Sequence, residues 1–291
     1  MIANNGRLKI AIQKSGRLTD DSISLLRACG LEFEFQKQSL YSPCRNFGLD
    51  VLALRDDDIP EYVQDGVADL GIVGENIVRE KRAQVATITK LGYGHCRLTL
   101  SVPRRSKIRT VAQLNRKRIA TTYPAILQQF LRSQKLKAEI IELSGSVELA
   151  PTLDVADAIC DIVSTGTTLR MNGLVPLHVV LASEAMLIAN RETMKHPEKK
   201  RLVERLLIRI SGSLQARGKR YMMMNAPSSA ISRIASILPS LKSPTVVPLA
   251  EAGMVAVHSV IAEDVLWDVM EKLKEAGASD IIVIPIETII R

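Results

Sequence analysis

The residues best suited to chemistry lie in the stretch Glu148–Leu169, which ends in the hydroxyl-rich loop Ser164–Thr168. The apolar run Ala158–Val163 before the loop predicts a strand, and a helix is expected to begin near Thr167. Backbone N–H groups and hydroxyls at such a strand-to-helix turn are suited to hold a phosphate. Asp161, just before the loop, could accept hydrogen bonds from sugar hydroxyls. Together these groups predict a ribose 5-phosphate site.

The same loop allows a simpler interpretation. Thr165–Thr168 could be an ordinary turn in which a threonine caps the following helix. The acidic residue on the preceding strand favours the phosphate site, but composition alone does not name the sugar phosphate.

Short apolar runs that alternate with helical patterns must position this loop. Strands are predicted at Leu8–Ile12, Val51–Leu54, Leu70–Val73, Arg97–Val102, Arg118–Thr122, Glu139–Leu143, Ala158–Val163 and Leu177–Ala182. Helices are predicted at Thr19–Cys29, Ile59–Asp65, Tyr123–Gln134, Thr167–Met171 and His196–Arg217. This alternation predicts an α/β fold, and the unbroken apolar strands fit sheets covered on both faces.

The pattern changes after Gly218. Strands are predicted at Tyr221–Asn225, Thr245–Leu249, Met254–Ile261 and Asp280–Ile286, and helices at Ser228–Leu238 and Glu263–Ala276. This βαββαβ order is ferredoxin-like and long enough for a small separate domain. Trp267, on the second of these helices, is expected to be packed.

Bulk properties exclude several classes of protein. The net charge of +8 suits anionic partners, but the chain is only 3% aromatic, which disfavours nucleic-acid binding. The four cysteines include no CxxC pair, so buried reduced thiols are expected rather than a zinc site. No signal peptide and no apolar run of about 18–20 residues are visible, so a cytoplasmic protein without membrane contact is expected.

The stretch from Glu148 resembles the signature of ATP phosphoribosyltransferases. The matching residues are Glu148, Ala156, Ile159, Asp161, Ser164, Thr165, Gly166, Thr168 and Leu169. Asp154 stands where that family usually has glycine. The resemblance implies that Asp161 acts in catalysis and that 5-phosphoribosyl-1-pyrophosphate (PRPP) binds Asp161 and the loop residues Ser164, Thr165, Gly166, Thr167 and Thr168.

Two further segments carry the resemblance. Ala11–Leu18 is similar to the family's opening strand and Lys-x-Gly-Arg-Leu loop, which implicates Lys14 and Arg17 in catalysis and in ATP binding. Gly66–Asn76 is similar to a glycine-rich strand and turn, which implicates Asp69, Gly71 and Gly74 in ATP binding.

The resemblance covers essentially the whole chain, and it implies a reaction. Adenine N1 of ATP would attack C1′ of PRPP to give N1-(5-phosphoribosyl)-ATP and pyrophosphate. Mg²⁺ is the implied cofactor, held mainly by the pyrophosphate. A homo-oligomer, dimer or hexamer, is also implied.

The C-terminal segment resembles the regulatory domain of the family's long form, which needs no separate regulatory subunit. The resemblance implies feedback inhibition by histidine, bound by Asn225, Leu241, Ser243, Thr245 and Val260. Asn225 stands where some members have an acidic residue.

A bilobal, periplasmic-binding-protein-like catalytic core and a C-terminal ferredoxin-like domain are therefore expected. One lobe would comprise residues 1–92 and 181–217, the PRPP-binding lobe residues 93–180, and the regulatory domain residues 218–291. Two other classes share parts of this pattern. A solute-binding protein would usually carry an export signal, and an amino-acid-sensing regulator would need a DNA-reading element.

Overall fold

The structure is a computed structural model that describes residues 6–36, 39–163, 166–238 and 243–290. The chain divides into two compact units, residues 1–204 and 205–291. This boundary falls inside the long helix α6 (Pro197–Ala216), before the predicted boundary at residue 218.

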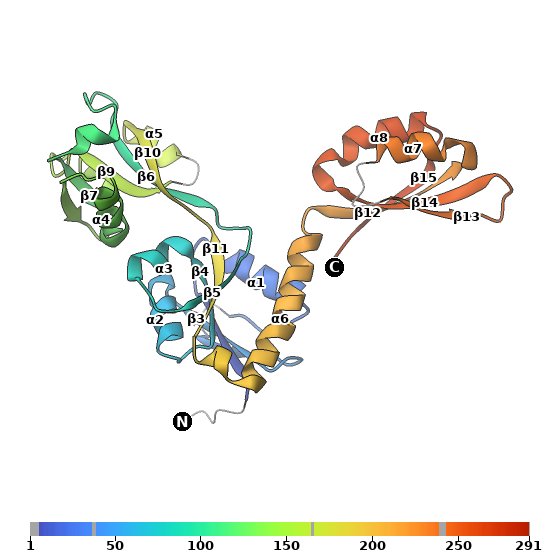
Figure 1. The fold of residues 1–291 in the computed structure, drawn as a ribbon, viewed down its shortest axis with the longest axis horizontal. Coiled ribbons are helices and arrows are strands. Elements are labelled where there is room, and N and C mark those ends of the chain that lie inside the picture. Colours follow the sequence, from blue (N-terminus) through green and yellow to red (C-terminus); the bar gives the residue numbers. More distant parts are fainter. Residues whose placement is uncertain (1–5, 37–38, 164–165, 239–242, 291) are drawn as a thin grey trace. The chain divides into compact units, whose positions relative to one another are not determined.

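The first unit begins with a lobe built on a six-stranded sheet of order β2-β3-β1-β4-β11-β5 (Figure 1). Its strands are β1 (Leu8–Gln13), β2 (Tyr41–Pro43), β3 (Leu49–Leu54), β4 (Leu70–Gly74), β5 (Ala86–Lys90) and β11 (Ala185–Ala189). Its helices are α1 (Thr19–Ala28), α2 (Ile59–Gln64) and α3 (Glu75–Lys81). β1 pairs in parallel with both β3 and β4, so the carboxyl ends of these three strands share one edge of the sheet.

The second lobe of this unit is built on a five-stranded sheet of order β10-β6-β9-β7-β8. Its strands are β6 (Cys96–Pro103), β7 (Arg118–Thr121), β8 (Glu139–Glu142), β9 (Ala158–Val163) and β10 (Leu174–Ser183), and its helices are α4 (Pro124–Ser133) and α5 (Thr167–Met171). β7 pairs in parallel with β8 and β9, so the loops after these strands also gather at one edge.

Two chain crossings join the lobes, one between β5 and β6 and one between β10 and β11. The second crossing occurs at Glu184, because β10 runs to Ser183 and β11 begins at Ala185. The prediction placed it at residue 181. The two-lobed α/β arrangement expected from the sequence is confirmed.

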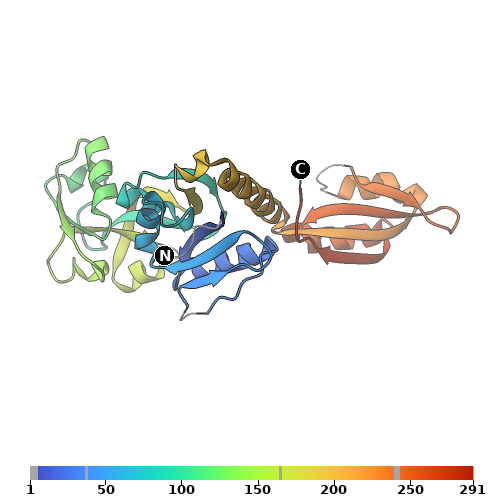
Figure 2. The same cartoon turned by 90° about the horizontal axis from the view of Figure 1, so that it is seen from below.

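The second unit contains a four-stranded antiparallel sheet of order β13-β14-β12-β15. Its elements are β12 (Lys219–Pro227), α7 (Ile231–Ile237), β13 (Thr245–Pro248), β14 (Met254–Ala262), α8 (Leu266–Glu275) and β15 (Ser279–Pro285). The βαββαβ order confirms the ferredoxin-like prediction, and both helices cover the same face of the sheet (Figures 1 and 2).

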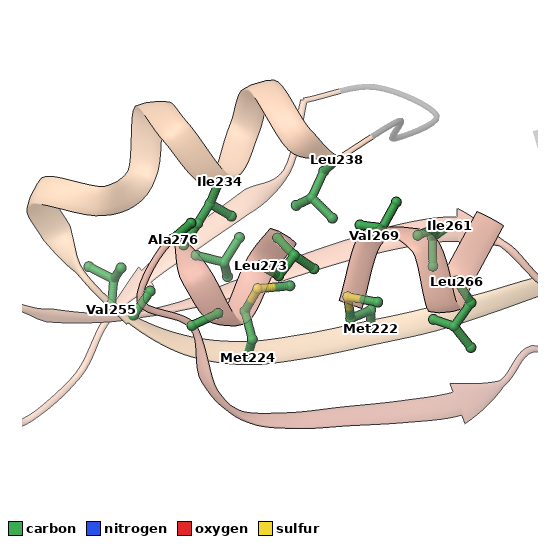
Figure 3. Close-up of a cluster of buried hydrophobic side chains, with 13 residues drawn as sticks. Met222, Met224, Ile234, Leu238, Val255, Ile261, Leu266, Val269, Leu273 and Ala276 are labelled. Carbon is green, nitrogen blue, oxygen red and sulfur yellow. The ribbon is translucent and has the colours of Figure 1, made fainter. Parts of the chain in front are cut away.

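The covered face of this sheet forms the core of the second unit. Met222 and Met224 of β12 pack against Ile234 of α7 and Leu273 of α8, and all four side chains are buried (Figure 3). Trp267 was expected to be packed, which is wrong: it lies on α8 with 76% of its surface exposed.

Two expectations about the whole chain can be compared with the structure. All four cysteines are free and buried, as predicted. Within the described residues, no helix has the length and apolar character required to cross a membrane.

Candidate active site

Lys14 and Arg17 lie in the loop that follows β1, at the carboxyl edge of the first sheet. The backbone N–H of Lys14 donates to the carbonyl of Leu54 (2.7 Å), which holds this loop beside the end of β3. Arg17 is exposed, and its guanidinium donates to Sγ of Cys96 (3.2 Å) at the start of β6. The parallel pairing of β1 with β4 brings Gly74 to the same edge. Ligands of open α/β sheets bind at such edges.

Gly74 ends β4 and leads into α3. A Cβ at this position would collide with Oδ1 of Asn76, so the turn requires glycine. Asn76 is buried: its backbone N–H donates to Ser183 Oγ (3.0 Å), and its side-chain amide donates to the hydroxyl of Tyr123 (3.3 Å). Because Tyr123 belongs to the second lobe, this turn connects the edges of both sheets.

Glu80 of α3 makes a second connection between the lobes. The backbone N–H groups of Ala125 and Ile126, in the first turn of α4, donate to its two carboxylate oxygens (2.8 and 3.0 Å). These N–H groups have no partner within a helix, and an anion at a helix N-terminus is favourable. Glu80 therefore caps a helix of the opposite lobe.

Asp69 lies at the other end of β4, away from this edge. It is 4% exposed and accepts hydrogen bonds from the backbone N–H of Lys9 (2.8 Å), Thr193 Oγ1 (2.7 Å) and Lys199 Nζ (2.7 Å). These partners describe a carboxylate that fastens β1 and the start of α6 to the sheet. Its contact with ATP stays a prediction.

Gly71 lies within β4 under helix α2. An added Cβ would come within 2.7 Å of Ile59 and 2.9 Å of Val63. The close packing of α2 on the sheet therefore explains this glycine, and its role toward ATP also stays a prediction.

Asp161 and Glu148 line one pocket of about 150 Å³ at the carboxyl edge of the second sheet. Burial raises the pKa of Asp161, and the charge of Glu148 raises it further, while the backbone N–H of Ile162 and the hydroxyl of Thr122 oppose the rise. Two carboxylates in a partly desolvated pocket are stabilised by hydroxyl donors or by a cation. The pocket is therefore suited to a ribose or to a metal-bound ligand.

The predicted phosphate loop borders this pocket. Gly166 and Thr168 line it, and Gly166 has a φ of +77°, a conformation that glycine adopts at little cost. Thr167 and Thr168 are exposed at the start of α5. Ser164 and Thr165 lie outside the described residues.

Tyr123 and Glu148 are the site residues that sequence reasoning did not assign. Tyr123 is the N-cap residue just before α4, and its phenol is half-buried. Burial raises its pKa well above the usual value, and the charge of Asp161 adds to this, so the phenol stays protonated. Glu148 belongs to the same signature as Asp161, and this shared motif is the sequence signal that places both carboxylates at one site.

Three of the residues that the resemblance implicates in binding histidine, Asn225, Thr245 and Val260, lie on the sheet of the second unit. Asn225 is opposite Ala256, and Thr245 is opposite His258, which is itself opposite Met223 of β12. Residues directly opposite one another share a face, and alternate residues of a strand do also. Asn225 and Thr245 therefore share the open face, and so does Val260, two residues after His258. Ser243 is exposed just before β13, and Leu241 lies outside the described residues.

The described residues contain no group of three or more His, Cys, Asp or Glu side chains that could hold a metal ion by themselves. The pocket at the carboxyl edge of the second sheet offers two carboxylates for a metal ion, those of Glu148 and Asp161. Mg²⁺ commonly takes one or two protein carboxylates and fills its remaining positions with substrate phosphates and water. The pair fits an ion that arrives with a pyrophosphate.

Comparisons with known proteins agree with this geometry. A family model described as ATP phosphoribosyltransferase matches residues 55–212, and one described as the HisG C-terminal domain matches residues 216–288. An ATP phosphoribosyltransferase of Cytophaga hutchinsonii is 50% identical over 284 residues, covering 98% of this chain and 99% of the relative. A solved chain described as the ATP phosphoribosyl transferase (HisG:HisZ) complex from Thermotoga maritima is 31% identical with a TM-score of 0.59, covering 70% of this chain and 98% of that chain. The chain therefore belongs to the ATP phosphoribosyltransferase family, in the long form that carries the additional C-terminal domain.

Proposed function

We propose that Asp161 and Glu148 hold the ribose hydroxyls of PRPP while the loop Ser164–Thr168 holds its 5′-phosphate. The observation that carries this proposal is the shared pocket, in which both carboxylates and Gly166 line one small volume. A ribose presents two neighbouring hydroxyl donors, and the paired carboxylates present acceptors for both. The raised pKa of Asp161 indicates a carboxylate that gains from such donors.

In this proposal, Lys14 and Arg17 bind the phosphate groups of the substrates. Both lie in the loop after β1, and the guanidinium of Arg17 contacts Cys96 at the crossing into the second lobe. Their positive charges stabilise the negative charge that develops on the departing pyrophosphate. Gly74, at the same edge, allows the close approach of a nucleotide to the backbone.

The reaction then proceeds by substitution at C1′ of PRPP. The lone pair of adenine N1 forms the new N–C bond, and the C–O bond to pyrophosphate breaks with its electron pair leaving on oxygen. Mg²⁺, when bound to the pyrophosphate, neutralises part of this charge. The residues of the pocket fix the ribose so that C1′ faces the nucleotide, and positioning of this kind contributes much of the rate. The phenol of Tyr123, which accepts a hydrogen bond from Asn76, stays protonated because of its burial and the charge of Asp161.

The second unit would regulate the enzyme by binding histidine on the open face of its sheet, in a homo-oligomer and without a separate regulatory subunit. Asn225, Thr245 and Val260 share this face. The face also exposes Val247, Ile282 and Ile284. An apolar face of this kind is suited to pack against another copy of the chain.

Substitution of Asp161 tests the proposed site. Asp161→Asn keeps the size of the side chain and removes its charge, and we expect kcat/KM for PRPP to fall about 100-fold. The product is followed by the change in adenine ultraviolet absorbance when the protein is mixed with ATP, PRPP and Mg²⁺.

Asp154→Asn is the matched control, because Asp154 is an exposed acid on the same segment outside the pocket. It should keep normal kinetics. Normal kinetics in Asp161→Asn would remove Asp161 from the site.

A further inference from the structure

The four strands of the regulatory sheet contain a single carboxylate, Asp280 of β15. The face proposed to bind histidine otherwise offers polar groups without negative charge, among them the amide of Asn225, the hydroxyl of Thr245 and the ring of His258, together with apolar side chains. Histidine carries a positively charged α-ammonium group. A neutral amide oxygen can accept one hydrogen bond from it but supplies no compensating charge.

A bulge in β15 places Asp280 beside Asn225. Asn225 is opposite Ser279, whereas Met223, two residues earlier, is opposite Ile282. β15 therefore has one more residue than β12 in this interval, which is the signature of a β-bulge. Asp280 has a φ of +49°, a left-handed conformation that aspartate and asparagine tolerate better than most residues. Bulges commonly redirect a side chain at a functional site.

The hydrogen bonds of Asp280 hold its carboxylate on the open face. The side-chain amide of Asn225 donates to Oδ2 of Asp280 (3.2 Å), and the hydroxyl of Ser279 donates to the same oxygen (3.1 Å). Among the described residues no donor reaches Oδ1, and the side chain is exposed. One oxygen is thus fixed by the protein, and the other is available to a ligand.

We propose that Asp280 supplies the negative charge that binds the α-ammonium group of the amino-acid effector, with Asn225 acting as the residue that positions this carboxylate. The inference rests on the proposed regulation by histidine and assigns the acid of that site. Asn225 donates its N–H to Asp280, so its amide oxygen remains able to accept a second N–H of the same ammonium group. Asn225 and Asp280 together thus give the ammonium group the negative charge and the two acceptor oxygens that a single acidic side chain would provide.

The test combines two variants with two ligands. Asp280→Asn removes the charge and keeps a residue that tolerates positive φ, and Asp280→Gly removes the side chain where glycine is relaxed. The ligands are L-histidine and imidazolepropionic acid, which lacks the ammonium group. Affinity of the full-length protein is measured by calorimetry, together with inhibition of the absorbance assay.

Wild-type protein should bind L-histidine about 10- to 100-fold more tightly than imidazolepropionic acid, as expected for hydrogen bonds to a charged group. Both variants should lose most of this preference and bind the two ligands similarly. Glu271→Gln, an exposed acid on α8 across the sheet, should keep the wild-type preference. The double variant Asn225→Asp/Asp280→Asn returns one carboxylate to the pair and should recover the preference.

The outcomes separate the two proposals. If wild-type protein neither binds L-histidine nor is inhibited by it, histidine regulation fails, and the role of Asp280 fails with it. If wild-type protein is inhibited and prefers L-histidine, and the folded Asp280 variants retain that preference, only the assignment of Asp280 is overturned.

Discussion

Glu80 allows the connection between the two lobes of the first unit to be tested by a single substitution. Its two carboxylate oxygens accept the backbone N–H groups of Ala125 and Ile126 at the start of α4, and the residue at the N-cap of this helix, Tyr123, makes no side-chain cap. Glu80→Ala leaves both N–H groups without this partner. Helix caps contribute about 0.5–2 kcal/mol, and hydrogen bonds to charged groups lie at the upper end. We therefore expect the free energy of unfolding to fall by about 2 kcal/mol.

Glu80→Gln separates charge from hydrogen bonding. The glutamine side chain has one acceptor oxygen in place of two, so it can serve one N–H group, and the expected loss is about 1 kcal/mol. Urea unfolding measures both losses. Hydrogen exchange at Ala125 and Ile126 measures the local effect, and a loss of about 2 kcal/mol corresponds to roughly 30-fold faster exchange.

Lys81→Ala is the control for this experiment, because Lys81 is the exposed next residue on the same helix. It should leave both measurements near wild type. Equal unfolding curves for Glu80→Ala and Lys81→Ala, with unchanged exchange at the start of α4, would refute the reasoning.

Three further substitutions have outcomes that follow from the structure. Burial raises the pKa of Asp161, so the folded protein favours the neutral carboxyl group. The stability from this neutral form is complete below the unfolded pKa of about 3.9 and is lost as pH rises through the folded pKa. Asp161→Asn removes the charge and should therefore raise the thermal unfolding temperature at pH 7 and not at pH 4. An equal rise at both pH values would show that the charge is not the cause. Asp154 has a φ of +54°, so Asp154→Ala should be about 1 kcal/mol less stable than Asp154→Gly in urea unfolding, and equal stability would contradict the strain argument. Asp69→Asn weakens the bond to Lys199 inside the first lobe and should lower the free energy of unfolding by about 2–3 kcal/mol with an unchanged KM for ATP. A raised KM for ATP without loss of stability would instead support a nucleotide contact.

The apolar runs of the sequence predicted most strands because their pattern is local. β9 and α5 match their predicted bounds residue for residue, and the βαββαβ order of the second unit was predicted correctly. Four elements were missed: β2, α3, β5 and β11. β11 is a five-residue apolar run separated from β10 by Glu184 alone, and only its pairing with β4 and β5 assigns it to the other sheet. Such long-range pairing leaves no periodic signal in the sequence.

The candidate site was predicted where chemistry and position coincide in one segment. The loop after β9 met this condition, because strand, acid and hydroxyls follow one another in the chain. For Asp69 the sequence does not show the partners Lys9, Thr193 and Lys199, which come from distant segments, and its contact with ATP stays a prediction. Asp280 was placed at the start of a strand, but its pairing with Asn225 depends on a bulge that composition does not reveal.

The position of β11 has a consequence for synthesis of the protein. β11 lies between β4 and β5 in the first sheet, and β5 has no other neighbour in that sheet. A nascent chain that has left the ribosome as far as Lys90 therefore exposes β5 as an unpaired strand until residues 185–189 emerge, after the whole second lobe. The sheet of the first lobe can therefore be completed only after the whole inserted lobe has been synthesised.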